Sequence, residues 1–276
     1  MLSHPIVPYR YRPRQTLPHS LPRSGYANRM REWWALLQAD CAGRLRGYAA
    51  PLLGDLAQAV ACAFLFMVIA PLGGQDGGPY WVFLLAGLAP WFYYENALLG
   101  CANACFSYAP LIRQNLCRPA LLPPVRTAAA LLHALPWFLA AAVSAGAAGV
   151  LSPRWWYLLP YCLLAGTMQG VAEGYFAAMF APFFGKFVAQ GMRLTLSLFF
   201  WITPVAWPAA RLNGANAMMA LSPIHYVVDT ARAAVLAGAP FPAWNRTLWF
   251  WCLMIGLAVA GAAGCSRLHE PYREVL

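Results

Sequence analysis

Charged side chains are scarce in this chain. Only 10% of its 276 residues are Asp, Glu, Lys or Arg, whereas 61% are hydrophobic. A soluble domain of this composition would expose a largely apolar surface to water, so an ordinary soluble protein is excluded. Segments of about 10 residues with alternating polar and apolar side chains are also missing, which excludes a transmembrane barrel. The sequence therefore predicts an all-α integral membrane protein.

A phosphate-binding loop is missing as well. The one Gly-Lys pair, Gly185-Lys186, is followed by Phe187 and has no upstream glycine at the required spacing. No polar segment is long enough to form a nucleotide-binding domain. Any ATP-driven activity therefore needs a separate ATPase subunit. We expect no catalytic residue and no cofactor on this chain, with ATP and Mg²⁺ bound by that partner.

Cysteine pairs with metal-ligand spacing are absent too. The eight cysteines include no CxxC pair, and only Cys101 and Cys105, four residues apart, share a helical face. The five histidines show no ligand spacing either. We expect the cysteines to be small packing residues rather than metal ligands.

What the chain does have is long apolar runs free of charge. A spanning helix needs about 17 to 25 residues, and six runs meet or approach this length: 56–75, 77–94, 127–153, 155–172, 194–210 and 247–266. We therefore expect six transmembrane helices, at about 52–72, 79–104, 125–150, 155–180, 188–208 and 245–265.

Basic residues are distributed unevenly between the connections. If both termini are cytoplasmic, fifteen Lys and Arg residues lie inside and four outside. This bias predicts a multi-pass membrane protein with both termini in the cytoplasm. The formal net charge of +10 is then explained by orientation and anionic lipids, and we expect no nucleic-acid partner.

Two different segments precede the first span. Residues 1–29 contain five arginines among five prolines and are expected to form a flexible basic arm. We expect no cleavable signal peptide, because the first hydrophobic run begins after residue 50. Residues 30–48 are expected to form an interfacial amphipathic helix, with Trp33 and Trp34 on its apolar face. A soluble helix packed on another subunit is the alternative.

The stretch after the fifth run is unlike a span. Residues 194–208 end on Pro204 and Pro208, and residues 222–238 then show apolar side chains at helical spacing with His225, Asp229 and Arg232 on another face. A helix with three polar groups is poorly suited to crossing the bilayer. We expect residues 209–240 to lie at the external interface or to dip back into the protein as short external re-entrant helices. Their polar groups either pair internally or meet a cargo.

The connection between the second and third spans, residues 107–124, is the best candidate for contact with an ATPase. A short helix with an apolar face is expected there, ended by Pro119. A plain basic loop that only anchors the topology is the alternative. The residues expected to couple to the ATPase are Leu111, Ile112, Arg113, Gln114, Asn115 and Arg118.

Three stretches together resemble the membrane subunit of type-2 ABC exporters, in particular those that export polysaccharides or teichoic acids. They are GLAPWFYYENALLGCANACFSYAPLIRQNLCRPALLPP, the pair LFFWITPVAWP and LSPIHYVVDTARAAVLAG, and the tail SRLHEPYREVL. The resemblance covers roughly residues 30–276, which we treat as one transmembrane domain. It implies a homodimer bound to two nucleotide-binding ATPase subunits, with the conduit along the dimer interface.

The resemblance also implies a cargo, a lipid-linked glycan of the O-antigen, capsule or teichoic-acid kind. Aromatic rings stack on sugar faces, so the expected translocation path is lined by Trp91, Phe92, Tyr93, Tyr94, Glu95, Phe199, Phe200 and Trp201. Many of these rings are alternatively interfacial belt residues. The expected external gate consists of Pro204, Pro208, His225, Asp229 and Arg232.

Two other functions remain open at this stage. One is a type-2 ABC permease for a lipooligosaccharide or a small hydrophobic drug. The other is a membrane-embedded glycosyl or acyl transferase, which would need converging acids, and the intramembrane candidates are Glu95 and Glu173. These two acids are alternatively partners in hydrogen bonds between helices.

Overall fold

Helices make up nearly all the regular structure of the protein. The computed structural model describes residues 26–47, 49–69, 78–114, 117–208, 222–268 and 272. Extended structure is limited to isolated bridge positions in these residues, including the bridge between Leu151 and Leu236. The predicted all-α class is therefore confirmed for the described part of the chain.

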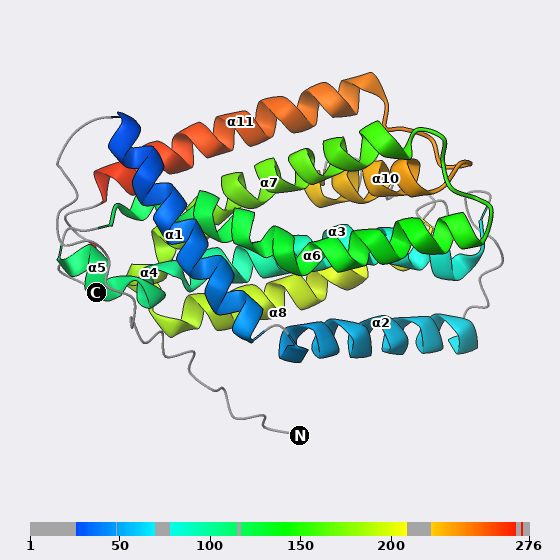
Figure 1. Ribbon diagram of the computed structural model, residues 1–276, viewed down its shortest axis with the longest axis horizontal. Helices are drawn as coiled ribbons and strands as arrows, with labels where there is room; N and C mark the ends of the chain where they lie inside the picture. Colours follow the sequence, from blue (N-terminus) through cyan, green and yellow to red (C-terminus); the bar gives the residue numbers. More distant parts are fainter. Residues whose placement is uncertain are drawn as a thin grey trace.

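The long helices run side by side along the longest axis of the molecule (Figure 1). Their bounds are α2 (Ala49–Ile69), α3 (Tyr80–Ala102), α6 (Leu122–Ala147), α7 (Trp155–Phe184), α8 (Lys186–Ile202) and α11 (Trp244–Arg267). Each of the six stretches expected to span the membrane is thus helical over most of its described residues. A further helix, α1 (Tyr26–Arg46), crosses the outside of this bundle at an angle.

Short helices lie near the two ends of the bundle (Figure 1). The connection from α3 to α6 contains α4 (Ala104–Ser107), α5 (Ala109–Arg113) and the 3₁₀ turn η1 (Pro119–Leu121). The connection from α8 to α11 contains α10 (Pro223–Val235), which lies toward the other end. Residues 209–221, the first part of the predicted re-entrant segment, lie outside the described residues.

Proline and glycine set several helix boundaries. Proline occupies one of the first two positions of α5, η1, α6 and α10, where its missing N–H is not needed. Gly185 separates α7 from α8 with φ of +62°, a backbone conformation that side chains other than glycine rarely adopt. The α7–α8 corner therefore depends on this glycine.

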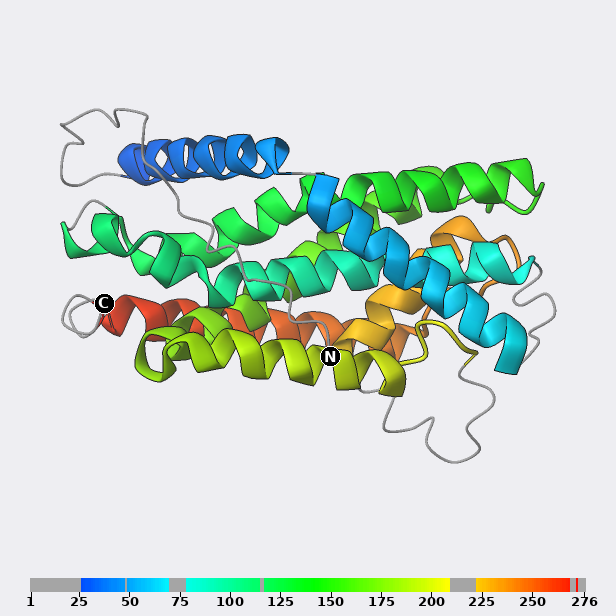
Figure 2. The ribbon, with the colours of Figure 1, turned by 90° about the horizontal axis from the view of Figure 1, so that it is seen from below.

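The core is centred on α3, which contacts α6, α7, α10 and α8. The contacts of α11 are chiefly with α7 (Figure 1). By contrast, α2 lies at the edge of the bundle in Figure 1 and is tilted across the other long helices in Figure 2, and it packs mainly on α3. Consequently α2 has much of its surface free, whereas α3 is almost enclosed by other helices.

Three helices of the described residues are long and apolar enough to cross a membrane by length and composition: Tyr80–Ala102, Pro119–Ala147 and Trp244–Arg267. Shorter apolar stretches occur at Leu52–Leu65 and Phe187–Ile202. The structure therefore supports a membrane protein with three such helices, fewer than the six we expected.

Several expected boundaries differ from the structure, among them the end of α8 and the start of α1. The expected fifth span reached residue 208, but α8 ends at Ile202, and residues 203–206 form a buried turn instead. The expected interfacial helix began at residue 30, but α1 begins at Tyr26. The remainder of the expected basic arm, residues 1–25, lies outside the described residues.

Candidate functional site

A groove of about 450 Å³ lies between α2, α3 and α8, and we call it the α2–α8 groove. Trp91 and Glu95 line it from α3, and Phe200 and Trp201 line it from α8. The wall from α2 consists of Gln58, Ala61, Cys62, Phe64 and Leu65. Aromatic rings beside a carboxyl group and an amide form a surface that suits a ligand with both apolar faces and hydroxyl groups.

The rings of the groove hold one another in place. The Trp91 and Phe200 ring centroids are 5.3 Å apart in an edge-on arrangement, and those of Phe200 and Trp201 are 5.5 Å apart. Trp91 and Phe200 are nearly covered, whereas Trp201 is half exposed. The groove therefore has a rigid aromatic wall, and the exposed rings of Trp201 and, on the α2 side, Phe64 are free to meet a ligand.

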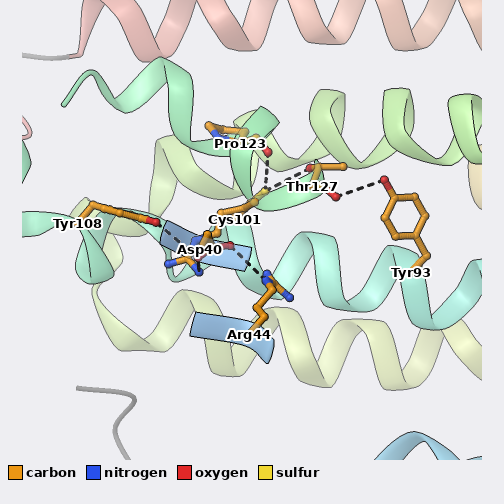
Figure 3. A network of polar contacts seen from close by, with 8 residues as sticks. Asp40, Arg44, Tyr93, Cys101, Tyr108, Pro123 and Thr127 are labelled. Atoms are coloured by element: carbon orange, nitrogen blue, oxygen red, sulfur yellow. Dashed lines mark hydrogen bonds and ion pairs between the residues drawn. The ribbon is translucent and has the colours of Figure 1, made fainter. Parts of the chain in front are cut away.

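Two of the aromatic residues expected along a path are instead inside the core. Phe92 packs on Trp137, with ring centroids 5.0 Å apart. The Tyr93 hydroxyl is 2.8 Å from the Thr167 hydroxyl and donates to the Thr127 carbonyl at 3.4 Å (Figure 3). Successive helical residues point about 100° apart, so five consecutive residues cannot all face one path.

Tyr94 and Phe199 line a different cavity of about 740 Å³, between α3, α7, α8, α10 and α11. We call it the α7–α8 hollow. Its polar wall is formed by Glu173, which accepts hydrogen bonds from the Tyr94 hydroxyl at 2.5 Å and from the Gln169 amide at 2.9 Å. The other walls are mainly apolar, including Leu98, Phe176, Phe180, Met192, Leu196 and Leu257.

The two glutamates that the sequence predicted to lie within the membrane do not meet. Glu95 lines the α2–α8 groove, whereas Glu173 lines the α7–α8 hollow and is held by neighbouring side chains. The expectation that Glu173 hydrogen-bonds to a neighbouring helix is confirmed through Tyr94 of α3. A transferase would need converging acids, and the structure does not bring these two together.

The polar face of α10 is divided between two separate partners. His225 is 3.4 Å from Asp229, and Arg246 of α11 donates to Asp229 at 3.0 Å. Arg232, expected on the same face, points elsewhere and donates to the carbonyl oxygens of Pro204 and Val205 at 2.8 and 2.7 Å. Of the two alternatives for these groups, the structure therefore shows internal pairing.

Arg232 attaches the turn that follows α8 to α10 through these two hydrogen bonds. Its guanidinium lies 3.7 Å from the Phe83 ring centroid, and the turn that holds Pro204 is buried. A Cβ atom placed on Gly87 would collide with the Val205 carbonyl, so only glycine permits this close approach of α3. Pro208 is partly buried at the end of the same turn.

All residues of α10 except Pro223 and Asp229 are buried. Ile224, Val227, Val228, Ala231 and Val235 were expected to share a covered face, and all are buried. His225, Thr230 and Arg232 are buried as well. The segment therefore dips into the protein, packed on α3 and α7, rather than lying on its surface.

The connection expected to couple to an ATPase is helical only in part. α5 covers Leu111, Ile112 and Arg113, while Asn115 and Leu116 lie outside the described residues. Arg113, Gln114 and Arg118 are exposed, and Leu111 is partly exposed. These side chains are available to a partner.

Ile112 corrects the expectation that the apolar face of this helix is free. It is fully buried within the chain itself, in a small core with Leu36, Tyr108, Cys117 and Tyr272. Burial raises the pKa of the Cys117 thiol to about 12. The reason is tertiary: Leu36 of α1 and Tyr272 belong to the same small core as Ile112, on the side of α5 that the sequence pattern left open.

A buried polar cluster joins α1 to this region, and the sequence analysis missed it. Asp40 accepts from Arg126 of α6 at 2.6 Å and from Arg44 at 3.2 Å. The Tyr108 hydroxyl donates to Asp40 at 3.5 Å (Figure 3), and Arg126 lies 5.1 Å from the centroid of the Tyr108 ring. α1 is thereby fastened to both α6 and the α4–α5 connection.

A signal for this cluster was present in the sequence. Asp40 lies four residues after Leu36 and four before Arg44, so the three share one helical face. We expected Trp33 and Trp34 to mark the apolar face, but Trp33 is partly buried and Trp34 is exposed. An acid within the packed face was the better indication of the docked side.

A second missed pair links α2 to α6. His133 Nε2 is 2.5 Å from the Asp55 carboxylate, and both side chains are mostly buried. Since α2 packs mainly on α3, this pair gives the peripheral helix a polar attachment to another part of the bundle. Its sequence signal was only a single acid near the start of an apolar run.

The cysteines are all free, and most are buried in packing positions. Throughout the ranges that the structure describes, no three His, Cys, Asp or Glu side chains gather as a metal site requires. A search with family models finds no match to this chain, and no curated protein matches it in sequence.

Proposed function

We propose that the chain is the membrane-spanning permease subunit of an ATP-driven exporter of the type-2 ABC kind. Its cargo would be a lipid-linked polysaccharide such as an O-antigen, capsule or teichoic-acid-like glycan. In this proposal two copies form a homodimer in the bacterial inner membrane, and two ATPase subunits bind the cytoplasmic side. The proposal accounts for the missing phosphate-binding loop, since the ATPase is a separate chain.

The order of elements is the observation that carries the proposal. A connection with the short helices α4, α5 and η1 lies between two long apolar helices, and the short buried helix α10 lies between two others. The first resembles a coupling segment and the second an external re-entrant segment. They lie toward opposite ends of the bundle, as a permease driven from one side requires (Figure 1).

Six spans with both termini cytoplasmic are part of the proposal. Large hydrophobic side chains are exposed on every one of the six long helices, including Phe64, Trp81, Leu139, Leu164, Leu198 and Val259. Exposed apolar side chains on all six helices, although only Trp81 on α3, favour contact with lipid or with a second copy. The count of fifteen inside and four outside basic residues favours this orientation.

The α2–α8 groove is the proposed segment of the conduit in each subunit. It combines the half-exposed ring of Trp201 with Glu95 and Gln58, which offers stacking together with hydrogen bonding to hydroxyl groups. Tyr94 and Phe199 line the α7–α8 hollow instead. The proposed path is therefore lined by fewer of the predicted residues than the sequence indicated.

The experiment tests the exposed arginines of the coupling segment. Arg113→Glu and Arg118→Glu are combined in the chain co-expressed with its ATPase, and cell-surface glycan is measured. Charge reversal at an interface rim weakens a complementary contact, so we expect export and permease-dependent ATPase activity to fall about tenfold. Co-purification of the ATPase is recorded in parallel.

Arg267→Glu is the matched control, because Arg267 is exposed at the end of α11 outside that segment. It should leave export near the wild-type level. Unchanged assembly, export and ATPase activity in the double variant would contradict the proposal.

A second candidate is a permease for a small hydrophobic molecule, and the α7–α8 hollow favours it. A volume of about 740 Å³ with apolar walls and one carboxyl group matches the size and chemistry of a drug-sized ligand. Deleting the gene separates the two cargoes. Intracellular lipid-linked glycan accumulates in the first case, and sensitivity to a hydrophobic cation rises in the second.

A further inference from the structure

A third hollow, of about 460 Å³, lies where α7 begins, and it belongs to neither cavity described above. We call it the Arg154 hollow. It is lined by Arg154, Tyr157, Leu158, Tyr161 and Phe241. α7 supplies three of these residues, and Phe241 comes from the connection between α10 and α11. α7 begins at the end of the bundle away from α4 and α5 (Figure 1), so the residues that line the hollow lie toward that end.

Arg154 gives this hollow its charge. Its side chain is partly buried directly before α7. Within the described ranges it forms no salt bridge, whereas Arg126 and Arg246 are each paired with an acid. Within the part of the chain that the structure describes, the acid of α10, Asp229, is already paired with Arg246 and His225. The Arg154 guanidinium is therefore a cation available to an anionic ligand.

The aromatic wall of the hollow is fixed in place. The Tyr161 hydroxyl accepts a hydrogen bond from the Trp251 indole at 2.8 Å and is 2.6 Å from the Tyr226 hydroxyl. The Phe241 ring lies 5.9 Å from the Tyr161 ring, centroid to centroid. A wall that is already ordered loses little conformational freedom when a ligand binds.

The surroundings of the hollow resemble a membrane–water boundary. Trp156 is 66% exposed and Trp244 is 74% exposed, and Trp155 is also exposed next to Arg154. Exposed tryptophans of this kind gather at the level of the lipid headgroups. A planar guanidinium matches the geometry of a phosphate, and the adjacent apolar walls match the hydrocarbon or ring next to it.

We propose that the Arg154 hollow binds a phosphate-bearing headgroup, supplied by an anionic phospholipid of the surrounding membrane. Arg154 contacts the phosphate, and the rings of Tyr157, Tyr161 and Phe241 cover the glycerol and upper acyl region. This binding needs no ATPase and no glycan, so it stands independently of the proposed transport function.

The test uses the full chain in nanodiscs made of equal parts phosphatidylglycerol and phosphatidylcholine. Lipids that remain bound after release are counted by native mass spectrometry. Wild type should retain phosphatidylglycerol in preference to phosphatidylcholine, and Arg154→Gln should weaken that retention about tenfold, because a charge-assisted hydrogen bond is lost. Tyr157→Leu removes one exposed ring and should weaken it about threefold.

Arg267→Gln is the control of equal charge change at the other end of the bundle, and it should retain the wild-type amount. Size-exclusion chromatography verifies that each variant is folded. Equal retention by wild type and Arg154→Gln overturns the proposal, as does an equal loss in Arg267→Gln.

A second arm distinguishes the source of the phosphate. Radiolabelled inorganic phosphate and glucose 1-phosphate are titrated against the chain in nanodiscs of phosphatidylcholine alone. Binding there that depends on Arg154, without retention of phosphatidylglycerol, supports a phosphate site but assigns it to a soluble ligand. Retention of phosphatidylglycerol with no binding of either soluble phosphate supports the lipid as the occupant.

Discussion

Asp40 and Asp229 form similar polar clusters near opposite ends of the bundle. Each pairs with a side chain four residues away on its own helix and with an arginine from a distant helix. The Asp40 side chain is 7% exposed and that of Asp229 is 23% exposed. Asp40 attaches α1 to α6 and Tyr108, whereas Asp229 joins α10 to α11. Because solvent screens the second pair more, the two clusters should contribute unequally to stability.

The largest effect is expected from Asp40→Asn. The substitution leaves the positive charge of Arg126 largely buried without its carboxylate, and breaking such a pair lowers the free energy of unfolding by about 3 kcal/mol. Denaturant unfolding in mixed micelles, followed by tryptophan fluorescence, measures the change. The matched variant Arg44→Gln removes only the more exposed partner and should lower stability by about 0.5 kcal/mol. Equal losses in the two variants would contradict the assigned role of burial.

A smaller loss is expected from Arg232→Met, which tests the attachment of α8 beside the Asp229 cluster. The guanidinium donors to the Pro204 and Val205 carbonyls disappear, while a side chain of similar length remains. We expect the free energy of unfolding to fall by about 2 kcal/mol, because two buried carbonyls lose their donors. Hydrogen exchange of the 199–206 segment should rise. If exchange stays at the wild-type rate there, Arg232 does not hold the end of α8.

The smallest loss is expected from Asp229→Asn. Its partner Arg246 is itself 22% exposed, so the pair contributes about 1 kcal/mol. Unfolding and cell-surface glycan are measured on the same variant. A modest loss of stability with export retained fits a purely internal pair. Loss of export in a fully stable protein would instead place Asp229 in contact with the cargo. Asp40 and Asp229 would then differ in function and not only in their contribution to stability.

The apolar patterns in the sequence identified where helices lie, since a helix requires only local spacing and composition. Residues 127–153 and 247–266, for example, were expected in spans, and α6 and α11 cover most of them. The candidate site was less predictable. Trp91 and Trp201 line the α2–α8 groove. Phe92 and Tyr93, which follow Trp91 directly and were expected along the same path, are in the core. Only the packing of α6 and α7 on α3 determines which ring is covered.

The sequence pattern also did not predict how the buried polar side chains are paired. His225, Asp229 and Arg232 share a helical face by spacing, yet α11 pairs with the first two and the end of α8 takes the third. Likewise, the sequence pattern predicted that Ile112 lies on a face free to dock on a partner. In the structure Ile112 is buried in a core with Leu36 of α1 and Tyr272. In each case the partner comes from a segment far away along the chain, and no local pattern encodes it.

By itself, the sequence determined that this protein is built from apolar helices suited to a membrane, because hydrophobic composition and run length act without reference to the rest of the chain. It also determined that no phosphate-binding loop is present in the chain. Only the tertiary structure decided which helix faces are covered, which acids are paired and where hollows remain. Those properties depend on which helices pack together, and packing brings distant residues into contact.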